Sequence, residues 1–322
     1  MSLPVFFMVY SAAYSAEYRI IELGPFSGNS SIARGINDYS TIVGWSYNDP
    51  VNYSSFLSYG NKNSTELALS YAGLNQAYAI NHQNIIAGWA YVDSSLLHAV
   101  QFTHGQVKDL GTLGGRTSQA FGLNDSNQIV GYSEISAGVI HAFLYENGEM
   151  KDLGTLGGWN SQAFGINNYG QVVGWSDIDQ FSYHAFLYEN GEMKDLGTLG
   201  GWNSQAFAIN GLGQIVGCSE TETGEVHAFL YESGEMKDLG TLGGPVSKAH
   251  GINNKGQIIG YSEIPSGETH AFLFEKGWMS DLGTYFGNNS SQALAINNRG
   301  QIIGWSDFLS RMRVAVMWEP VK

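Results

Sequence analysis

Short runs of apolar, β-branched and aromatic residues alternate along the chain with turns rich in Asn and Gly. The arrangement repeats about every 43 residues, and the pair Ile-Asn (once Leu-Asn) marks each repeat. The asparagines of these pairs are Asn37, Asn81, Asn124, Asn167, Asn210, Asn253 and Asn297. They are spaced by 44, 43, 43, 43, 43 and 44 residues, so the sequence contains seven copies of one unit.

Each copy predicts four short strands. In the copy that begins at Ser161, the runs SQAFGIN, QVVGWSD, HAFLY and MKDLG are separated by NYG, by the variable stretch IDQFSY and by ENGE. Asn and Gly in short turns favour hairpins, because both residues tolerate a positive φ. No segment shows a sustained helical period, so almost no helix is expected. The pattern predicts an all-β, seven-bladed β-propeller with four strands per blade over residues 16–322.

The two ends of the chain predict how the ring closes. The segment YRIIELG at 18–24 aligns with the fourth strand of a unit, and RVAVMWE at 313–319 aligns with the third strand of the last unit. We expect these segments to pair antiparallel in one blade, since that pairing removes two exposed strand edges.

Two series of ionisable residues recur at the period of the blades. The histidines are His98, His141, His184, His227 and His270, and the aspartates, eleven residues later, are Asp109, Asp152, Asp195, Asp238 and Asp281. A two-residue Asn-Gly turn would make each pair diagonal neighbours on one side of a hairpin. The two units without this histidine, which carry Ser54 and Val314 instead, also lack the aspartate and carry Glu66 and Glu22. This matching supports a contact between the two positions.

The His and Asp residues could be read as a base with its orienting carboxylate, completed by a serine such as Ser176 or Ser219. The set occurs five times, however, whereas an active site occupies one place in a ring. We therefore interpret it as a buried structural bracket, in one blade His184 and Asp195 with Ser176 and Trp175, similar in kind to the bracket of WD-repeat propellers. A metal ring is not expected, because equivalent mid-blade positions diverge radially. Another series is expected to pack between blades: Trp45, Trp89, Tyr132, Trp175, Cys218, Tyr261 and Trp305.

The loops between second and third strands vary between copies and share one face of the predicted propeller with the interblade TLGG loops. Function concentrates on variable loops held by a rigid scaffold. This variable-loop face carries several acids and two tryptophans, which would suit a saccharide or a cationic group. The candidate ligand-binding residues are Trp159, Trp202, Arg116, Asp177, Asp179, Glu220 and Glu263, and further acids on this face are Glu134, Glu222 and Glu225.

Charge and composition narrow the partners. The net charge of −14 repels nucleic acid and anionic membranes, so neither is an expected partner. Cys218 is the single cysteine, which excludes a disulfide framework and a thiolate metal cluster. The TLGG loops lack the Lys and the helix of a phosphate loop, and the stretches NDSNQ and NNKGQ are too short for a calcium loop. No cofactor and no metal is expected.

The first residues resemble a secretory signal. An apolar run at Leu3–Tyr10 is followed by small residues and a cleavage position after Ser15, although no Lys or Arg precedes the run. The run is too short to span a bilayer. We expect residues 1–15 to be a signal peptide and the protein to be extracellular or periplasmic; the alternative is an ordinary first strand.

The blade motif HAFLYENGEMKDLGTLGG, followed by INxxGQIVGxS, resembles the HAF-repeat family of extracellular repeats. The resemblance is close in units three to six and looser in the outer three. It implies a secreted or surface-exposed propeller and brings no activity or catalytic residue. We expect a monomeric binding module for a saccharide or protein ligand. The alternatives are a carbohydrate-active hydrolase or lyase, with carboxylates on the variable-loop face or in the central channel, and a unit of a structural surface array.

Overall fold

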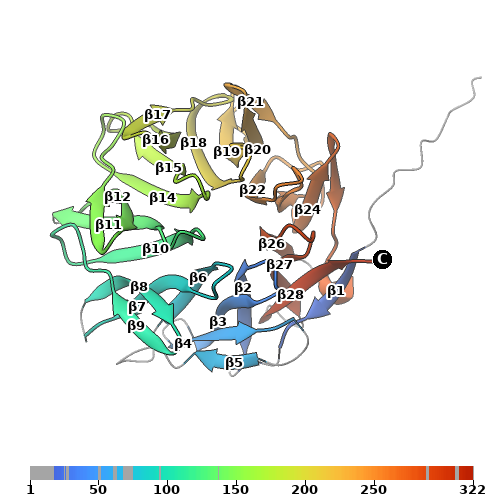
Figure 1. Ribbon diagram of the computed structural model, residues 1–322. Helices are drawn as coiled ribbons and strands as arrows, with labels where there is room; N and C mark the ends of the chain where they lie inside the picture. The colour runs from blue at the N-terminus through green and yellow to red at the C-terminus, as the bar shows by residue number, and fades with distance from the viewer. Residues whose placement is uncertain are drawn as a thin grey trace, which may run out of the picture.

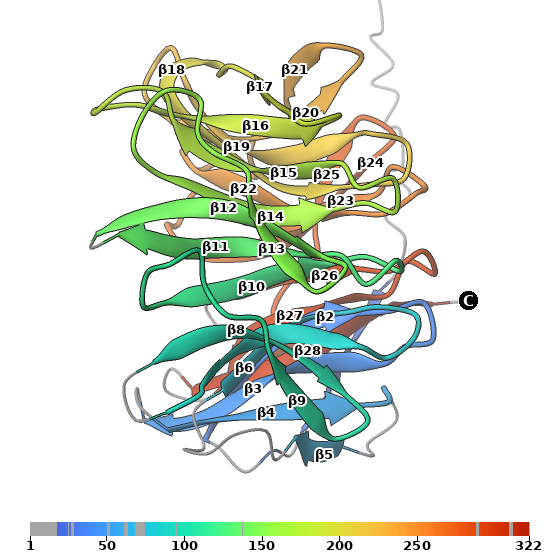
Figure 2. The ribbon, with the colours of Figure 1, turned by 60° about the vertical axis from the view of Figure 1, so that its left-hand side comes forward.

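The computed structural model is a ring of seven antiparallel sheets, each with four strands. It describes residues 18–24, 26, 29–49, 52–60, 64–67, 75–93, 96–136, 138–287, 290–308 and 312–321. The expected signal peptide at 1–15 lies outside these residues. In Figure 1 the sheets follow one another around a central axis in sequence order, and Figure 2 shows them from the side. The fold class predicted from the repeats is confirmed.

In blades one to six the strands run from the innermost to the outermost in chain order, and in blade seven β1 takes the outermost place. Blade one is β2 (Ser30–Ile36), β3 (Ile42–Asp49), β4 (Asn52–Ser58) and β5 (Ser64–Leu67); blade two is β6 (Asn75–Ile80), β7 (Ile86–Tyr91), β8 (Leu97–Thr103) and β9 (Gln106–Asp109); blade three is β10 (Ser118–Leu123), β11 (Ile129–Ser136), β12 (Val139–Glu146) and β13 (Glu149–Asp152); blade four is β14 (Ser161–Ile166), β15 (Val172–Asp177), β16 (Tyr183–Glu189) and β17 (Glu192–Asp195).

Blade five is β18 (Gly200–Ile209), β19 (Ile215–Thr221), β20 (Val226–Glu232) and β21 (Glu235–Asp238); blade six is β22 (Ser247–Ile252), β23 (Ile258–Glu263), β24 (Thr269–Glu275) and β25 (Trp278–Asp281); blade seven is β26 (Ser291–Ile296), β27 (Ile302–Phe308), β28 (Met312–Pro320) and β1 (Tyr18–Glu22). The helical segment in the described part of the chain is the 3₁₀ turn η1 (Tyr285–Gly287), as the absence of a helical period predicts.

The last blade closes with the N-terminal strand. β1 pairs antiparallel with β28, with Tyr18 opposite Pro320 and Glu22 opposite Val316. The Leu23 amide continues the ladder by donating to the Ala315 carbonyl at 2.9 Å. The blue and red ends of the chain meet in this blade in Figure 1. The predicted pairing of 18–24 with 313–319 is therefore confirmed.

The core lies between blades rather than inside any one sheet. In one such layer, Val173 and Ala185 of blade four pack with Ile215 and Phe229 of blade five, all fully buried. Both faces of a blade are therefore covered by neighbouring blades. This explains why apolar and polar residues alternate only weakly along its strands. Cys218 is buried in the position expected for it, and burial raises the pKa of its thiol to about 11.

A glycine in the second strand lets the two inner strands of a blade approach closely. A Cβ atom at Gly174 would lie 1.9 Å from the carbonyl oxygen of Gln162 in the first strand. The register shifts at this point, between Ala163 and Gly165, by a β-bulge. The bulge recurs in every blade, and so does the glycine, which follows Val, Ile or Ala and precedes Trp, Tyr or Cys.

The closure predicts a specific cost for truncating Leu23. This side chain is buried between the last and first blades, beside Ile42 and Met317. Leu23→Ala should lower the free energy of unfolding by about 2–5 kcal/mol, because it leaves a cavity in that layer. Arg19→Ala, which removes an exposed ion pair with Glu319, should cost about 1 kcal/mol or less. Chemical denaturation of both variants measures the difference, and equal costs would contradict closure by β1.

Candidate functional site

The five His–Asp pairs form direct hydrogen bonds at the outer edges of blades two to six. The distances from Nδ1 to a carboxylate oxygen are 2.7 to 2.9 Å. In blade three a two-residue turn, with φ of 53° at Asn147 and 90° at Gly148, places Phe143 opposite Asp152 as predicted. Asp152 also accepts a hydrogen bond from the amide of Gly154 at 2.7 Å. Each pair therefore braces a hairpin and the start of the following loop.

The expected buried bracket of four residues is found only in part. The histidine side chains are 14 to 18% exposed, but the aspartate side chains are 41 to 44% exposed. The observed bracket also excludes the serine and the tryptophan. The Ser176 hydroxyl instead accepts a hydrogen bond from the Leu156 amide at 2.8 Å, and Trp175 packs against Tyr183. Ser176 is therefore hydrogen-bonded to the interblade loop rather than to His184, and these residues form no nucleophilic triad in blade four.

The two tryptophans of the variable-loop face are exposed and lie beside braced backbone, Trp159 in a loop and Trp202 in β18. Trp159 is 68% exposed and Trp202 is 73% exposed. Asp177 accepts hydrogen bonds at 3.0 Å from both the backbone and side-chain nitrogens of Asn160, next to Trp159. Glu220 accepts in the same way from the Trp202 amide at 3.1 Å and from the Asn203 side chain at 2.9 Å. These two carboxylates fix the loop backbones, so that the indoles are held away from the protein.

The remaining candidates on this face are mostly engaged within their own loops. The Arg116 amide donates to Glu134 at 2.8 Å, and the pKa of Glu134 is lowered by this bond and by one from the Gly138 amide. Asp179 caps its own loop by accepting from the Phe181 and Ser182 amides. Glu263 occupies the position of Glu220, but the matching loop carries Pro245, which has no amide hydrogen to donate.

The opposite face carries a feature that the sequence analysis missed, a ring of asparagines around the central channel. The side-chain nitrogen of each Ile-Asn asparagine donates to the backbone carbonyl of the same asparagine in the next blade, at 3.0 or 3.1 Å. Asn297 donates to Asn37, so the ring is closed. Each Oδ1 also accepts from two amides of its own turn, as that of Asn167 does from Tyr169 and Gln171. All seven asparagines are buried.

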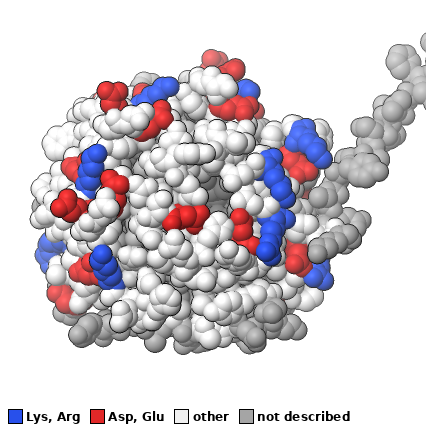
Figure 3. Space-filling model, viewed as in Figure 1, with Lys and Arg blue, Asp and Glu red and all other residues white. Residues whose placement is uncertain are grey.

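These asparagines line a cavity of about 280 Å³ at the mouth of the channel. The apolar residue before each asparagine lies in its wall, and so does the residue after it. The residues after the asparagines are Asp38, His82, Asp125, Asn168, Gly211, Asn254 and Asn298. In the space-filling view of Figure 3, acidic side chains lie beside the central hollow. The rim therefore differs between blades, whereas the asparagine ring does not.

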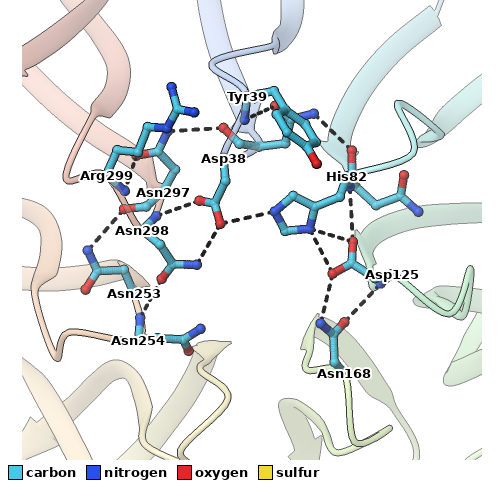
Figure 4. Close-up of polar contacts among 12 residues, drawn as sticks. Asp38, Tyr39, His82, Asp125, Asn168, Asn253, Asn254, Asn297, Asn298 and Arg299 are labelled. Atoms are coloured by element: carbon cyan, nitrogen blue, oxygen red, sulfur yellow. Dashed lines mark hydrogen bonds and ion pairs between the residues drawn. The ribbon is translucent and has the colours of Figure 1, made fainter.

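His82 joins two carboxylates across this rim (Figure 4). Its Nε2 lies 3.1 Å from Asp38 and its Nδ1 lies 2.8 and 2.9 Å from the two oxygens of Asp125. Burial alone would lower the pKa of His82, but the hydrogen bonds and charges of Asp125 and Asp38 outweigh it and raise that pKa. Burial would raise the pKa of both carboxyls, yet hydrogen bonds from Asn298 and His82 at Asp38, and from His82 and Asn168 at Asp125, lower it. The three side chains thus form an ion-paired triplet.

The sequence analysis assigned no functional residue to the turns that follow the Ile-Asn pairs. His82 does not belong to the recurring histidine series, and Asp38 and Asp125 are 44 and 43 residues away from it. The available signal was the ionisable residue that replaces the asparagine of other blades directly after the Ile-Asn pair, at Asp38, His82 and Asp125. In the described part of the chain, no group of three or more His, Cys, Asp or Glu residues is arranged to hold a metal ion. Nor does any helix among those residues have the length and apolarity to cross a membrane.

Comparison with known proteins supports the propeller fold and does not assign a function. No family model matches the chain, and no curated protein matches it in sequence. TolB from Acinetobacter baumannii superposes with a TM-score of 0.52 at 12% identity, over 74% of this chain and 62% of that one. A puromycin-hydrolyzing peptidase from Mycobacterium tuberculosis gives 0.53 at 8% identity, over 89% and 49%. Acylaminoacyl peptidase from Pyrococcus horikoshii gives 0.54 at 12% identity, over 87% and 50%. The chain therefore spans about half to three-fifths of these structures.

The asparagine ring predicts different costs for two adjacent side chains. Asn167→Ala removes the donor to the Asn210 carbonyl and the acceptor for two buried turn amides, so it should lower the free energy of unfolding by about 1–3 kcal/mol. Asn168→Ala, which removes two solvent-exposed hydrogen bonds to Asp125 on the rim, should cost less, about 1 kcal/mol or below. Chemical denaturation compares the two, and similar costs would show that the ring contributes little to stability.

The triplet predicts a pH-dependent contribution to stability. A raised His82 pKa stabilises the fold fully below the unfolded value of about 6.5, and the effect is lost as the pH rises through the folded value. The lowered pKa values of Asp38 and Asp125 stabilise above about pH 4 and are lost as the pH falls through their folded values. The stability difference between wild type and His82→Gln should therefore be largest near about pH 5.5, at about 1 kcal/mol or less, and shrink by about pH 9.

The exposed His104 provides the control for this experiment. It occupies a turn at a φ of 50°, which Asn tolerates, so His104→Asn should show no such maximum. Thermal or urea unfolding across the pH range measures both differences. A His82→Gln difference that does not change with pH would contradict the ion-paired triplet.

Proposed function

We propose that this protein is a secreted or periplasmic propeller of the HAF-repeat type that binds a saccharide on its variable-loop face. The observation that carries the proposal is the pair of outward indoles, Trp159 and Trp202, at equivalent sequence positions of adjacent blades, the first in the loop before β14 and the second near the start of β18. An indole combines a large apolar face with low conformational entropy, and an exposed one is suited to stack on the apolar face of a sugar ring.

The hydrogen bonds accepted by Asp177 and Glu220 order the backbone beside each indole, and this order supports a role in binding. Asp177 and Glu220 hold the loop amides next to the two tryptophans, so the indoles are presented by ordered backbone. Binding then costs little further ordering of the loops. The two tryptophans belong to the identical copies of the repeat, so each blade offers an indole to a ligand.

The alternative of a carbohydrate-active hydrolase or lyase finds less support. Glycoside hydrolysis needs a carboxyl that stays protonated near neutral pH, and hence one with a raised pKa. The carboxyl pKa values that shift within the described residues, among them those of Asp38, Asp125 and Glu134, all shift downward. Asp177 and Glu220 are occupied by backbone amides. A binding function is therefore the conclusion that the geometry favours.

The proposed location outside the cytoplasm follows from the signal-like residues 1–15 and from the resemblance of the blade motif to extracellular repeats. A net charge of −14 disfavours nucleic acid and anionic lipid surfaces as partners. A neutral or cationic polysaccharide fits this charge best.

A glycan array probed with the purified protein tests the proposal. Trp159→Ala and Trp202→Ala should each weaken binding to the retained glycans by about tenfold or more, since interface tryptophans commonly contribute about 2 kcal/mol or more. The matched control is Trp278→Ala, because Trp278 is 67% exposed but begins β25, directly after a third-to-fourth-strand turn on the opposite face. Equal losses in all three variants, or turnover of a polysaccharide without binding, would contradict the proposal.

A further inference from the structure

A layer of seven side chains lines the channel next to the mouth cavity. They come from the same position of the seven innermost strands, three residues before each ring asparagine. The layer consists of Arg34, Tyr78, Phe121, Phe164, Phe207, His250 and Leu294. All seven are only partly buried, and since neighbouring strands cover the innermost strands elsewhere, that exposure is to the channel. Blade one is therefore alone in placing a permanent charge in this layer.

Most of the layer is a continuous arc of rings. The centroid distances are 5.0 Å from Tyr78 to Phe121, 5.4 Å from Phe121 to Phe164, 5.4 Å from Phe164 to Phe207 and 5.1 Å from Phe207 to His250. Such spacings are typical of favourable aromatic pairs. The arc forms an apolar wall around much of the channel.

Arg34 stands at the end of this arc without a counter-charge. Its guanidinium carbon lies 5.2 Å from the Tyr78 ring and 5.1 Å from the Trp45 ring, so it has cation–π contacts. Its Nε is shielded from solvent and has no hydrogen-bond partner. Among the described residues, no hydrogen bond or ion pair engages any part of this guanidinium. A cation of this kind is costly to desolvate unless a partner satisfies its donors.

No side chain in the two channel layers supplies that partner. The layer beside the arc, on the side of the variable loops, consists of Ile32, Gln76, Gln119, Gln162, Gln205, Lys248 and Gln292. It contains an additional cation and no carboxylate. The acids of the mouth, Asp38 and Asp125, lie beyond the asparagine and isoleucine layers and are paired with His82. In a chain with a net charge of −14, this interior is locally positive.

His250 adds an unpaired donor to the same place. Burial, followed by the positive charges of Arg34 and Lys248, lowers the pKa of His250 to about 3, so the imidazole is neutral. Neither ring nitrogen has a hydrogen-bond partner among the residues that the structure describes. A neutral imidazole still offers one N–H. Arg34 and His250 flank Leu294, which carries the one aliphatic side chain of this layer.

We infer that the channel binds one small aromatic carboxylate, with its carboxylate on the Arg34 guanidinium and its ring against the Tyr78–Phe207 arc. The planar guanidinium matches the two oxygens of a carboxylate and would gain the charge-assisted hydrogen bonds that it lacks. The aromatic arc selects a flat apolar body over a hydrated one. The acidic mouth repels an anion, so the ligand enters from the side of the glutamine layer. This site is independent of the saccharide proposal.

The test uses benzoate as the probe and Arg34→Phe as the main variant. Phe is the residue of three other blades at this position, so the variant fits the existing arc. Isothermal titration calorimetry of the whole protein should show benzoate binding to wild type and at least about a tenfold weaker affinity for Arg34→Phe, the size expected for losing a charge-assisted pair. Arg299→Gln, at an arginine on the face of the mouth, should change the affinity by less than about twofold.

Further measurements distinguish binding at Arg34 from binding elsewhere on the protein. The Arg34 Nε–H resonance, assigned by its absence from Arg34→Phe, should shift on addition of benzoate. Acetate and inorganic phosphate should bind more weakly than benzoate, because neither uses the arc. Trp159→Ala and Trp202→Ala should leave benzoate binding unchanged, which keeps this test distinct from that of the saccharide face. No benzoate binding by wild type, equal binding by Arg34→Phe, or equal affinity for phosphate would each overturn the proposal.

Discussion

The hydrogen bond from each ring asparagine to the next blade is the contact on which the rest of the architecture depends. It fixes one atom of every innermost strand relative to its neighbour, at 3.0 or 3.1 Å, and the last link returns to Asn37. A closed ring requires the same geometry at each step, so the turns that carry these asparagines cannot vary in length. This explains why the turn from each asparagine to the second strand has the same length in all seven blades, although the residues within it differ.

The same constraint made the fold predictable from sequence. Repeat length, hairpin turns and interblade packing all recur in each unit, and each recurrence tests the assignment again. The exceptions were equally informative: Ser54 and Val314 replace the histidine in the two blades whose outer strands carry Glu66 and Glu22. The structure places Glu66 opposite Phe56 and Glu22 opposite Val316, as the His–Asp register requires. The recurring positions thus predicted both the blades and the closure of the last blade by β1 and β28.

Burial and function were harder to predict, for two physical reasons. Strand register shows that His184 and Asp195 meet, but it does not show how much solvent reaches an outermost strand, and Asp195 is 44% exposed. The side chains at the channel come from different blades and approach one another only around the axis. His82 and Asp38 are 44 residues apart and occupy equivalent positions of two repeats. Aligning the repeats shows that the positions are equivalent, but it does not show that the two side chains are in contact. Single departures from the repeat, such as Arg34 among phenylalanines, carry no periodic signal.

The position of a feature in the repeat therefore bears on the ligand that it suits. Trp159 and Trp202 belong to segments that are copied letter for letter, so they present the same side chain on adjacent blades, which suits a polymer with a repeating unit. Arg34 and His250 are each unique in their layer, and all seven blades converge on the channel that contains them. A single site on the axis suits one small ligand. Duplication of blades would thus extend the outer binding face, while substitutions in individual blades differentiate the channel without altering the asparagine links that close the ring.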